Sequence, residues 1–482
     1  MISVETADII RVLPQAILAG FAILVMLFEP FLPARRKTLL GWFSLFGVVA
    51  AGTGVVWTSF SPGLAFGGSV SADTFSFYFM ALFLAVAALT LLGSFKYLER
   101  DHINHGEFYA LILLATVGMC FMAASTDLIM VFLGLEISSI STYILAGFKR
   151  TDALSNEASL KYFLLGSFAT AFFLYGIAFM YGTTRTTNLL VLSERLATPA
   201  QWSPLAWVAL VLMFVGLAFK VSIVPFHVWT PDVYQGAPAP VTAFLSVGPK
   251  AAAFAVFLRL FLGALETGGS ASFWMLWVSA VLTMIVGNLA ALWQSNVKRL
   301  LGYSAIAHAG YVLVGVAAGG TEGTRSVLFY LAVYALMNVG VFLLVAHMAG
   351  TGERWTQIED YTGLAAERPG VAALLTVFML SLGGLPTTAG FFAKFYVFRA
   401  AVRADLIGLT IIAVLTSVIS IYYYLRLVVV MYMREGTAET SADPLPWALR
   451  AALAVSVVGI FYLGLYPGDF LLLTELAGKT LP

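Results

Sequence analysis

Residues 210–240 read LVLMFVGLAFKVSIVPFHVWTPDVYQGAPAP, an apolar run that contains one charge and is then interrupted. Lys220 stands inside the apolar part, and Pro225 follows it by five residues. Proline removes one backbone hydrogen bond and clashes with the carbonyl group four residues earlier, here that of Val221. Backbone freed at membrane depth survives only inside protein or beside a wet cavity. The stretch therefore predicts a broken membrane helix around a buried charge.

The composition indicates an all-α polytopic membrane protein. The chain has 482 residues, of which 60% are hydrophobic and 11% charged, and its mean hydropathy is +0.92. Soluble domains carry about 25% charged residues. With 26 basic and 25 acidic residues, the net charge is only +1, too small to attract nucleic acid. The apolar composition makes the lipid bilayer the expected partner. The single cysteine, Cys120, excludes an internal disulfide and a cysteine-ligated cluster.

Fourteen stretches reach the roughly 20 apolar residues that a membrane helix needs. They are 9–28, 39–60, 74–95, 108–124, 128–148, 158–182, 205–224, 241–262, 273–293, 301–318, 324–348, 371–399, 406–433 and 447–466. The first lacks a small-residue cleavage site and has a second span close behind it, so we expect a retained span and not a signal peptide.

Basic residues gather in the connections that follow odd-numbered spans. These are Arg35, Arg36, Lys37, Lys96, Arg100, Lys149, Arg150, Lys298, Arg299, Arg354, Arg368 and Arg434, against chiefly Arg185, Arg195, Arg325 and Arg403 in the even-numbered ones. Lysine and arginine favour the cytoplasmic side. With an even number of spans, both termini are then predicted on the periplasmic side.

A second interrupted helix is predicted at residues 377–398, VFMLSLGGLPTTAGFFAKFYVF, where Lys394 follows Gly383, Gly384 and Pro386. The two breaks lie five spans apart, so a second block of five helices would be inverted relative to the first. Inverted repeats with matching broken helices are typical of transporters, although ordinary proline kinks are the alternative. The predicted organisation is a three-helix segment at 1–105, repeats at 106–265 and 270–435, and a final span at 440–482.

Four charges, Glu136, Lys220, Lys250 and Lys394, lie within apolar spans and are predicted mid-helix. Each costs about 2.5–3.5 kcal/mol at the bilayer centre and typically marks an ion or proton path. Glu136 follows Asp127 by nine residues, or about 13 Å of helix, and we expect it to pair with a lysine; a structural salt bridge is the alternative. Burial disfavours a charged amine and a nearby carboxylate favours it, so movement of Glu136 would gate Lys220.

Lys250 and Lys394 complete the predicted proton path. Lys250 follows Gly248 and Pro249, which predict irregular backbone beside it. Lys394 would be the terminal site, with snorkelling to the interface as the alternative.

Two histidines and a further lysine are candidates for the same path. His308, in the tenth span, is either a proton relay or a hydrogen-bonded core residue. His227 follows Pro225 and Lys161 begins the sixth span, so both are candidates for proton uptake from the cytoplasm, with snorkelling favoured for Lys161. His102 and His105, in one loop, are two potential metal ligands without clear partners, which is a weak signal, and the many aromatic residues suit lipid-facing and interfacial positions.

Five segments resemble a known family: LGLEISSISTYILAGF (133–148), KYFLLGSF (161–168), GLAFKVSIVPFHVWTPDVYQGAPAPVTAFLSVGPKAAAF (216–254), NVKRLLGYSAIAHAGY (296–311) and GLPTTAGFFAKFYVF (384–398). They are similar to the antiporter-like membrane subunits of respiratory complex I, the NADH–quinone oxidoreductase of bacteria. Lys394, where the M-type has a glutamate, and a chain end soon after the fourteenth span, without the lateral helix of the L-type, favour the N-type. PTTAG at the second break departs from the expected PPLAG-like run.

The resemblance implies a role for each charged site. Glu136 would be the glutamate of the fifth helix, Lys220 its partner, Lys250 the central lysine and Lys394 the distal one, with His308 at a relay position. The chain itself would hold no cofactor. FMN, iron–sulfur clusters, NADH and quinone would bind in other subunits, and M-type, J-type and K-type subunits would be its neighbours in the bacterial inner membrane. A sodium/proton antiporter, a related complex with another electron donor, and a structural scaffold are the alternatives.

Overall fold

A computed structural model of the chain describes residues 5–265, 269–436, 438–441 and 443–480. Within these ranges, thirteen helices are long and apolar enough to cross a membrane. The prediction of an all-α polytopic membrane protein is confirmed.

The elements are, in chain order, α1 (Thr6–Arg11), α2 (Leu13–Phe28), η1 (Glu29–Phe31), η2 (Ala34–Arg36), α3 (Thr38–Thr58), β1 (Gly63–Ala65), β2 (Val70–Ala72), α4 (Thr74–Arg100), α5 (Gly106–Ala124), α6 (Leu128–Ala146), α7 (Ala153–Thr184), α8 (Leu189–Arg195), η3 (Pro199–Gln201), α9 (Pro204–Val221), α10 (Trp229–Gly236), α11 (Ala239–Arg259), η4 (Leu260–Ala264), α12 (Gly269–Leu292), α13 (Val297–Ala318), α14 (Gly320–Met348), η6 (Thr351–Glu353), η7 (Ile358–Tyr361), α15 (Leu364–Glu367), α16 (Pro369–Gly383), α17 (Ala389–Arg403), α18 (Ile407–Met433), α19 (Trp447–Leu465) and α20 (Gly468–Gly478). The strands β1 and β2 form a short antiparallel hairpin.

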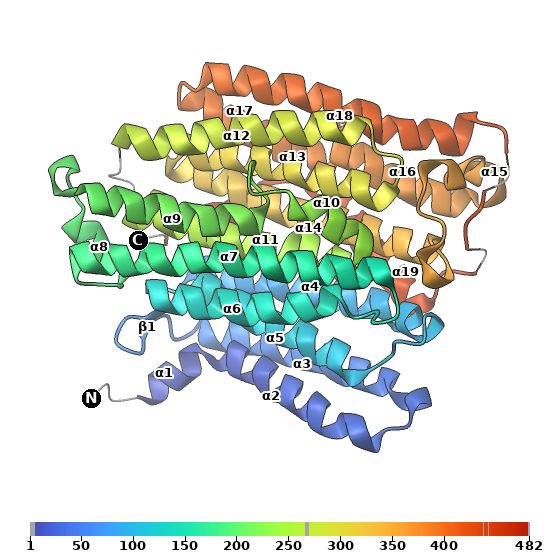
Figure 1. Ribbon diagram of the computed structural model, residues 1–482, viewed down its shortest axis with the longest axis horizontal. Helices are drawn as coiled ribbons and strands as arrows, with labels where there is room; N and C mark the ends of the chain where they lie inside the picture. The colour runs from blue at the N-terminus through green and yellow to red at the C-terminus, as the bar shows by residue number, and fades with distance from the viewer. Residues whose placement is uncertain (1–4, 266–268, 437, 442, 481–482) are drawn as a thin grey trace.

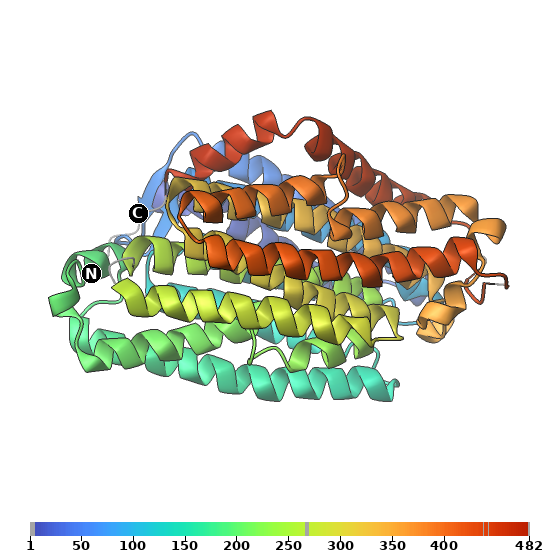
Figure 2. The same ribbon diagram turned by 90° about the horizontal axis from the view of Figure 1, so that it is seen from above.

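The long helices lie side by side along the longest axis of the molecule, and both chain ends lie at the same end of the bundle (Figures 1 and 2). The helices α11 and α14 are almost wholly buried, because they are apolar on all sides and surrounded by other helices. Outer helices such as α7 and α18 expose large apolar side chains, as a surface that meets lipid requires.

Both predicted helix breaks are present. The seventh span divides into α9 and α10, and the twelfth into α16 and α17. Because α16 and α17 have 15 residues each, they form the twelfth predicted span in two pieces and are not among the thirteen long helices. The inverted relation of the repeats at 106–265 and 270–435 stays a prediction, and part of the boundary between them, residues 266–268, lies outside the described residues.

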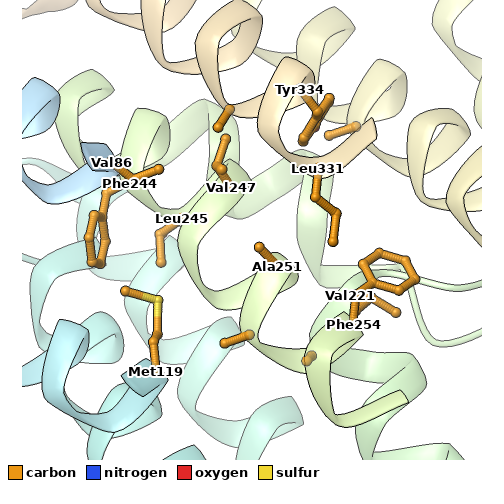
Figure 3. Close-up of a cluster of buried hydrophobic side chains, with 14 of the residues drawn as sticks. Val86, Met119, Val221, Phe244, Leu245, Val247, Ala251, Phe254, Leu331 and Tyr334 are labelled. Atoms are coloured by element: carbon orange, nitrogen blue, oxygen red, sulfur yellow. The ribbon is translucent and has the colours of Figure 1, made fainter. Parts of the chain in front are cut away.

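The prediction of irregular backbone beside Lys250 is wrong. The helix α11 runs unbroken through Pro249, and its irregular turn is the π-helical segment η4 further on. Surrounding helices support α11, and Figure 3 shows its residues Leu245 and Val247 among side chains of neighbouring helices. Gly248 serves close packing instead, since a Cβ atom there would lie 2.9 Å from the Met119 sulfur.

Close helix contact also fixes the position of α6, which carries Glu136. A Cβ atom on Gly118 of α5 would lie 2.5 Å from the carbonyl oxygen of Gly134 in α6, and one on Gly134 would lie 2.8 Å from that of Gly118. Small residues at such crossings let membrane helices approach closely. The backbone that presents Glu136 is therefore held against its neighbour.

Candidate functional site

The first helix break places Lys220 in the last turn of α9, one residue before the helix ends at Val221. Ser222 takes a left-handed conformation with φ of 67°. The backbone N–H groups after it are satisfied: that of Ile223 donates to Ala218 at 2.8 Å, and that of Val224 to the Thr283 hydroxyl at 3.1 Å. The prediction that Lys220 lies mid-helix is therefore wrong, although it does lie in the middle of a span, because Pro225 ends the helix early.

The amine of Lys220 lies among hydroxyl groups. Its Nζ donates to Ser139 Oγ at 2.8 Å and to Tyr162 OH at 3.3 Å. It also lies 5.4 Å from the centre of the Tyr162 ring and 5.8 Å from that of Tyr143, within cation–π range. Hydroxyls both donate and accept, so they bind the amine in either protonation state.

Glu136 acts on Lys220 without touching it. The carboxylate interacts electrostatically with the amine, but the contact to Lys220 from α6 is made by Ser139, one turn further along the helix. Lys220 forms no ion pair with any residue in the described part of the chain, so Glu136 and Lys220 are coupled electrostatically without a salt bridge. One buried oxygen of Glu136 has no hydrogen-bond partner among the described residues.

Lys250 lies at the centre of the bundle on α11. Its Nζ donates to the carbonyl oxygen of Ala305 in α13 at 3.2 Å and lies 5.4 Å from the centre of the Tyr234 ring. The hydroxyl of Tyr234 is buried and has no partner among the residues that the structure describes. A buried hydroxyl of this kind is suited to a bridging water.

His308 is held between two tyrosines. Its Nδ1 lies 2.6 Å from Tyr330 OH and its Nε2 lies 3.1 Å from Tyr424 OH, which also contacts Ser304 Oγ. The imidazole interacts electrostatically with both Lys250 and Lys394. The ring thus has a hydroxyl at each nitrogen and interacts with two amines, an arrangement that allows a relay as well as a structural role.

Lys394 follows the second break, in the second turn of α17. Its Nζ donates to the carbonyl oxygen of Gly383 at 2.9 Å, to Ser417 Oγ at 3.0 Å and to Ser420 Oγ at 3.4 Å. Exposed fractions of 2% for Lys220, 3% for Lys250 and 5% for Lys394 exclude snorkelling to an interface for all three.

The sequence analysis missed the tyrosines and serines around these charges. The missed residues are Tyr143, Tyr162, Tyr234, Ser304, Tyr311, Tyr330, Tyr334, Ser417, Ser420 and Tyr424. The expectation that aromatic residues face lipid or the interface is wrong for these tyrosines, which are buried. Hydroxyls inside apolar spans were the available signal, because buried polar groups need partners.

Lys161 and His227 lie beside this row and not within it. Lys161 Nζ forms ion pairs of 2.6 Å with both Glu157 and Asp232, and Asp232 also binds Arg299 at 2.6 Å. His227, half-buried, lies in the segment between α9 and α10. Their part in proton uptake stays a prediction.

Lys298, which the sequence analysis placed in a cytoplasmic connection, is buried. Its Nζ donates to Glu353 and to the carbonyl oxygen of Ala237, both at 2.6 Å. Glu353 also accepts from Tyr97 OH at 2.6 Å and from the backbone of Ala239 at 2.7 Å. These contacts hold the start of α11 against α4 and α13. They therefore fix the position of Lys250 along the axis of the bundle.

Of the two predicted metal ligands, His102 and His105, only His105 lies in a group of possible ligands among the described residues. His105 lies near Glu29 and Glu107 in a geometry that suits a metal ion. Lys37, however, is hydrogen-bonded to Glu29 and lies 3.4 Å from His105 Nδ1. A cation of the protein is therefore already paired with one of the two carboxylates in this group.

Comparison with known proteins agrees with this arrangement. The family model described as NADH:quinone oxidoreductase/Mrp antiporter, TM matches residues 125–420. NADH-quinone oxidoreductase subunit N 1 of Solibacter usitatus is 48% identical, over 96% of this chain and 95% of its own length. Subunit N of Trichlorobacter lovleyi is 45% identical over 98% of each chain.

Solved structures extend the likeness to the fold. A chain of respiratory complex I from Thermus thermophilus with bound aureothin is 37% identical, with a TM-score of 0.81 over 96% of this chain and 99% of that one. A chain of an archaeal membrane-bound sulfane sulfur reductase is 27% identical, with a TM-score of 0.85 over 96% and 97%. The chain belongs to the NADH:quinone oxidoreductase/Mrp antiporter membrane family and, within it, to the subunit N group of NADH–quinone oxidoreductases.

Proposed function

We propose that this chain carries protons across the membrane for a quinone-reducing respiratory complex, through a row formed by half-buried Glu136 and buried Lys220, Lys250, His308 and Lys394. The observation that carries the proposal is that the three buried amines bind hydroxyls and carbonyl oxygens, with no ion pair to any described residue. In a buried ion pair, the partner charge stabilises the ammonium and so retains its proton. Without such a partner, burial disfavours the charged ammonium and so favours release of the proton.

Electrostatic coupling links members of the row on each side of the gap between Lys220 and Lys250. Glu136 interacts with Lys220, and His308 interacts with both Lys250 and Lys394. Charges in a low-dielectric interior interact over longer distances than charges in water. A change of protonation at one site therefore alters the free energy of the proton at the next, which is what stepwise transfer requires.

No hydrogen bond among the described residues links Lys220 to Lys250, and a tyrosine lies near each amine. Tyr162 binds Lys220, and the ring of Tyr234, which interacts electrostatically with Tyr162 and Tyr334, lies 5.4 Å from the Lys250 amine. One or two waters would complete hydrogen bonds across this gap. We infer that Tyr234 anchors them.

The rest of the complex supplies the driving reaction. Electrons would pass from NADH through FMN and iron–sulfur clusters to quinone in other subunits, and M-type, J-type and K-type subunits would lie beside this chain. The complex would lie in a bacterial inner membrane with both termini of this chain on the periplasmic side. The likeness to the sulfane sulfur reductase keeps a complex with another redox partner as the second candidate.

Two measurements test the proposal. Purification of the chain with flavin and iron–sulfur proteins, and NADH oxidation by that complex, distinguish it from a freestanding sodium/proton exchanger and from a complex with another donor. In complexes reconstituted in vesicles, Lys220→Ala is expected to abolish proton pumping and Glu136→Ala is expected to slow it. Intact pumping by both assembled variants would refute the relay.

A further inference from the structure

A groove separate from the proton path opens between α3, α4, α14 and α19. Its volume is about 640 Å³. It lies where α3 and α19 begin and α4 and α14 end, which is the end of the bundle predicted to face the cytoplasm. It thus borders both the N-terminal segment and the last long helix of the chain.

Basic side chains line the rim of this groove. Lys96 and Arg100 come from α4 and Arg450 from α19. Lys96 is exposed, with a loose contact of 3.8 Å to Glu99, and Arg450 is exposed and uses its Nε–H on the carbonyl oxygen of Leu445 at 2.6 Å. Each therefore keeps N–H groups for a further acceptor.

The other charged groups at the rim are already engaged, except the exposed carboxylate of Asp443. Arg100 is held by Asp101 at 3.0 Å and donates to two carbonyl oxygens of α14. Glu99 accepts from the Thr38 hydroxyl at 2.7 Å, His347 contacts the backbone oxygen of Asp443 at 3.0 Å, and the Asp443 side chain is exposed. Lys96 and Arg450 remain as the two cations that can meet a ligand.

Tryptophans and aliphatic residues line the rest of the groove. Trp42 and Trp447 stack with ring centres 5.2 Å apart and 5° between their planes. Tryptophan is enriched at the headgroup level of a bilayer. Leu92, Leu343 and Leu449 line the apolar part. The groove thus offers cations and tryptophans at one level and a surface for hydrocarbon beside them.

We propose that this groove binds one anionic diacyl phospholipid, with its phosphate on Lys96 and Arg450 and an acyl chain along Leu92 and Leu449. Charge complementarity selects the ligand, because basic pockets between membrane helices on the cytoplasmic side bind anionic headgroups. The lipid joins α3 and α4 to α19, and thereby fastens the N-terminal segment of the chain to its last long helix.

Photolabelling of the assembled complex in vesicles tests the proposal. The probes are phosphatidylglycerol and phosphatidylcholine that carry a diazirine in one acyl chain, and labelled peptides are mapped by mass spectrometry. The anionic probe is expected to label peptides of α4 and α19 at least about tenfold more than the neutral probe. Unlabelled phosphatidylglycerol, and not phosphatidylcholine, should compete in the unmodified complex.

Variants distinguish the site from general attraction to a basic surface. K96Q/R450Q should lose at least about tenfold of the labelling, and K96R/R450K should keep it. The matched control R35Q/R36Q removes two exposed charges from the same end of the bundle and should leave labelling unchanged. Equal labelling by both probes, unchanged labelling in K96Q/R450Q, or no labelling of α4 and α19 because a neighbouring subunit fills the groove would overturn the proposal.

Discussion

The two broken helices place a lysine on opposite sides of the break. Lys220 precedes the break in α9 and binds hydroxyls of two other helices. Lys394 follows the break in α17 and donates back across it to the last carbonyl oxygen of α16, at Gly383. Carbonyl groups at the C-terminus of a helix favour a cation.

The difference separates a tunable site from a fixed one. Glu136 acts on Lys220 from a neighbouring helix, so movement of α6 would change the charge of Lys220. Lys394 forms no ion pair within the described ranges and is bound by backbone and serine oxygens. We infer that proton transfer is regulated at Lys220, beside the first break. Lys394, beside the second break, would be the last proton acceptor of the row.

The largest expected effect comes from removal of either amine. Lys220→Met and Lys394→Met keep the apolar stem and remove the titrating group. Each should reduce proton translocation by about 10²-fold or more, the usual range for loss of a proton-transfer group, measured by proton uptake into vesicles per NADH oxidised. Lys479→Met, at an exposed position, is the control. Normal pumping by one variant and none by the other would show that only one break carries protons.

The second prediction concerns how the breaks are built. A Cβ atom on Gly390 would lie 1.7 Å from the carbonyl oxygen of Ser381, whereas one on Gly370 meets nothing within 4 Å. Gly390→Ala should therefore destabilise the protein by about 1–3 kcal/mol, seen as a lower temperature of thermal unfolding, and Gly370→Ala should not. Equal unfolding temperatures would mean that α16 and α17 are not closely packed at this point.

The breaks themselves could be predicted from the sequence because they depend on local chemistry. Pro225 ended a helix at Val221, and the Gly383–Pro386 run ended another at Gly383, as proline and glycine dictate. The burial of three lysines also followed, since their apolar neighbours left no other position. Glu136 and Lys220 could not be placed relative to each other, because their separation depends on how α6 and α9 are rotated in the bundle. The irregular backbone predicted at Pro249 was wrong for the same reason. Packing of the surrounding helices against α11 outweighed the tendency of proline to break a helix.

The third prediction tests control at the first break. Glu136→Gln removes the charge that acts on Lys220 and keeps the shape of the side chain. Pumping should become slower than in the unmodified complex but remain faster than with Lys220→Met, since the amine is still present. A matched Asp443→Gln at an exposed rim position should have no effect. A loss as complete as that of Lys220→Met would make Glu136 a carrier in its own right.

The smallest effect on proton pumping is expected from a change in the gap between Lys220 and Lys250. Tyr234→Phe removes only the hydroxyl that we infer to anchor water near Lys250, and pumping should fall by a few-fold, about the effect of one neutral hydrogen bond. Tyr361 also has a buried hydroxyl without a partner among the described residues, so Tyr361→Phe is the matched control. Equal pumping by the two variants would remove Tyr234 from the row.

Lys250 lies between Lys220 and the pair His308 and Lys394 in the proposed row. Its replacement therefore tests most directly whether protons pass along that row. The measurement is the number of protons translocated per electron pair in vesicles that contain the assembled Lys250→Met complex. If protons pass along the buried row, this ratio falls below that of the unmodified complex although electron transfer to quinone continues when the membrane is uncoupled. An unchanged ratio would contradict the account, because protons would then cross without the amine at its centre.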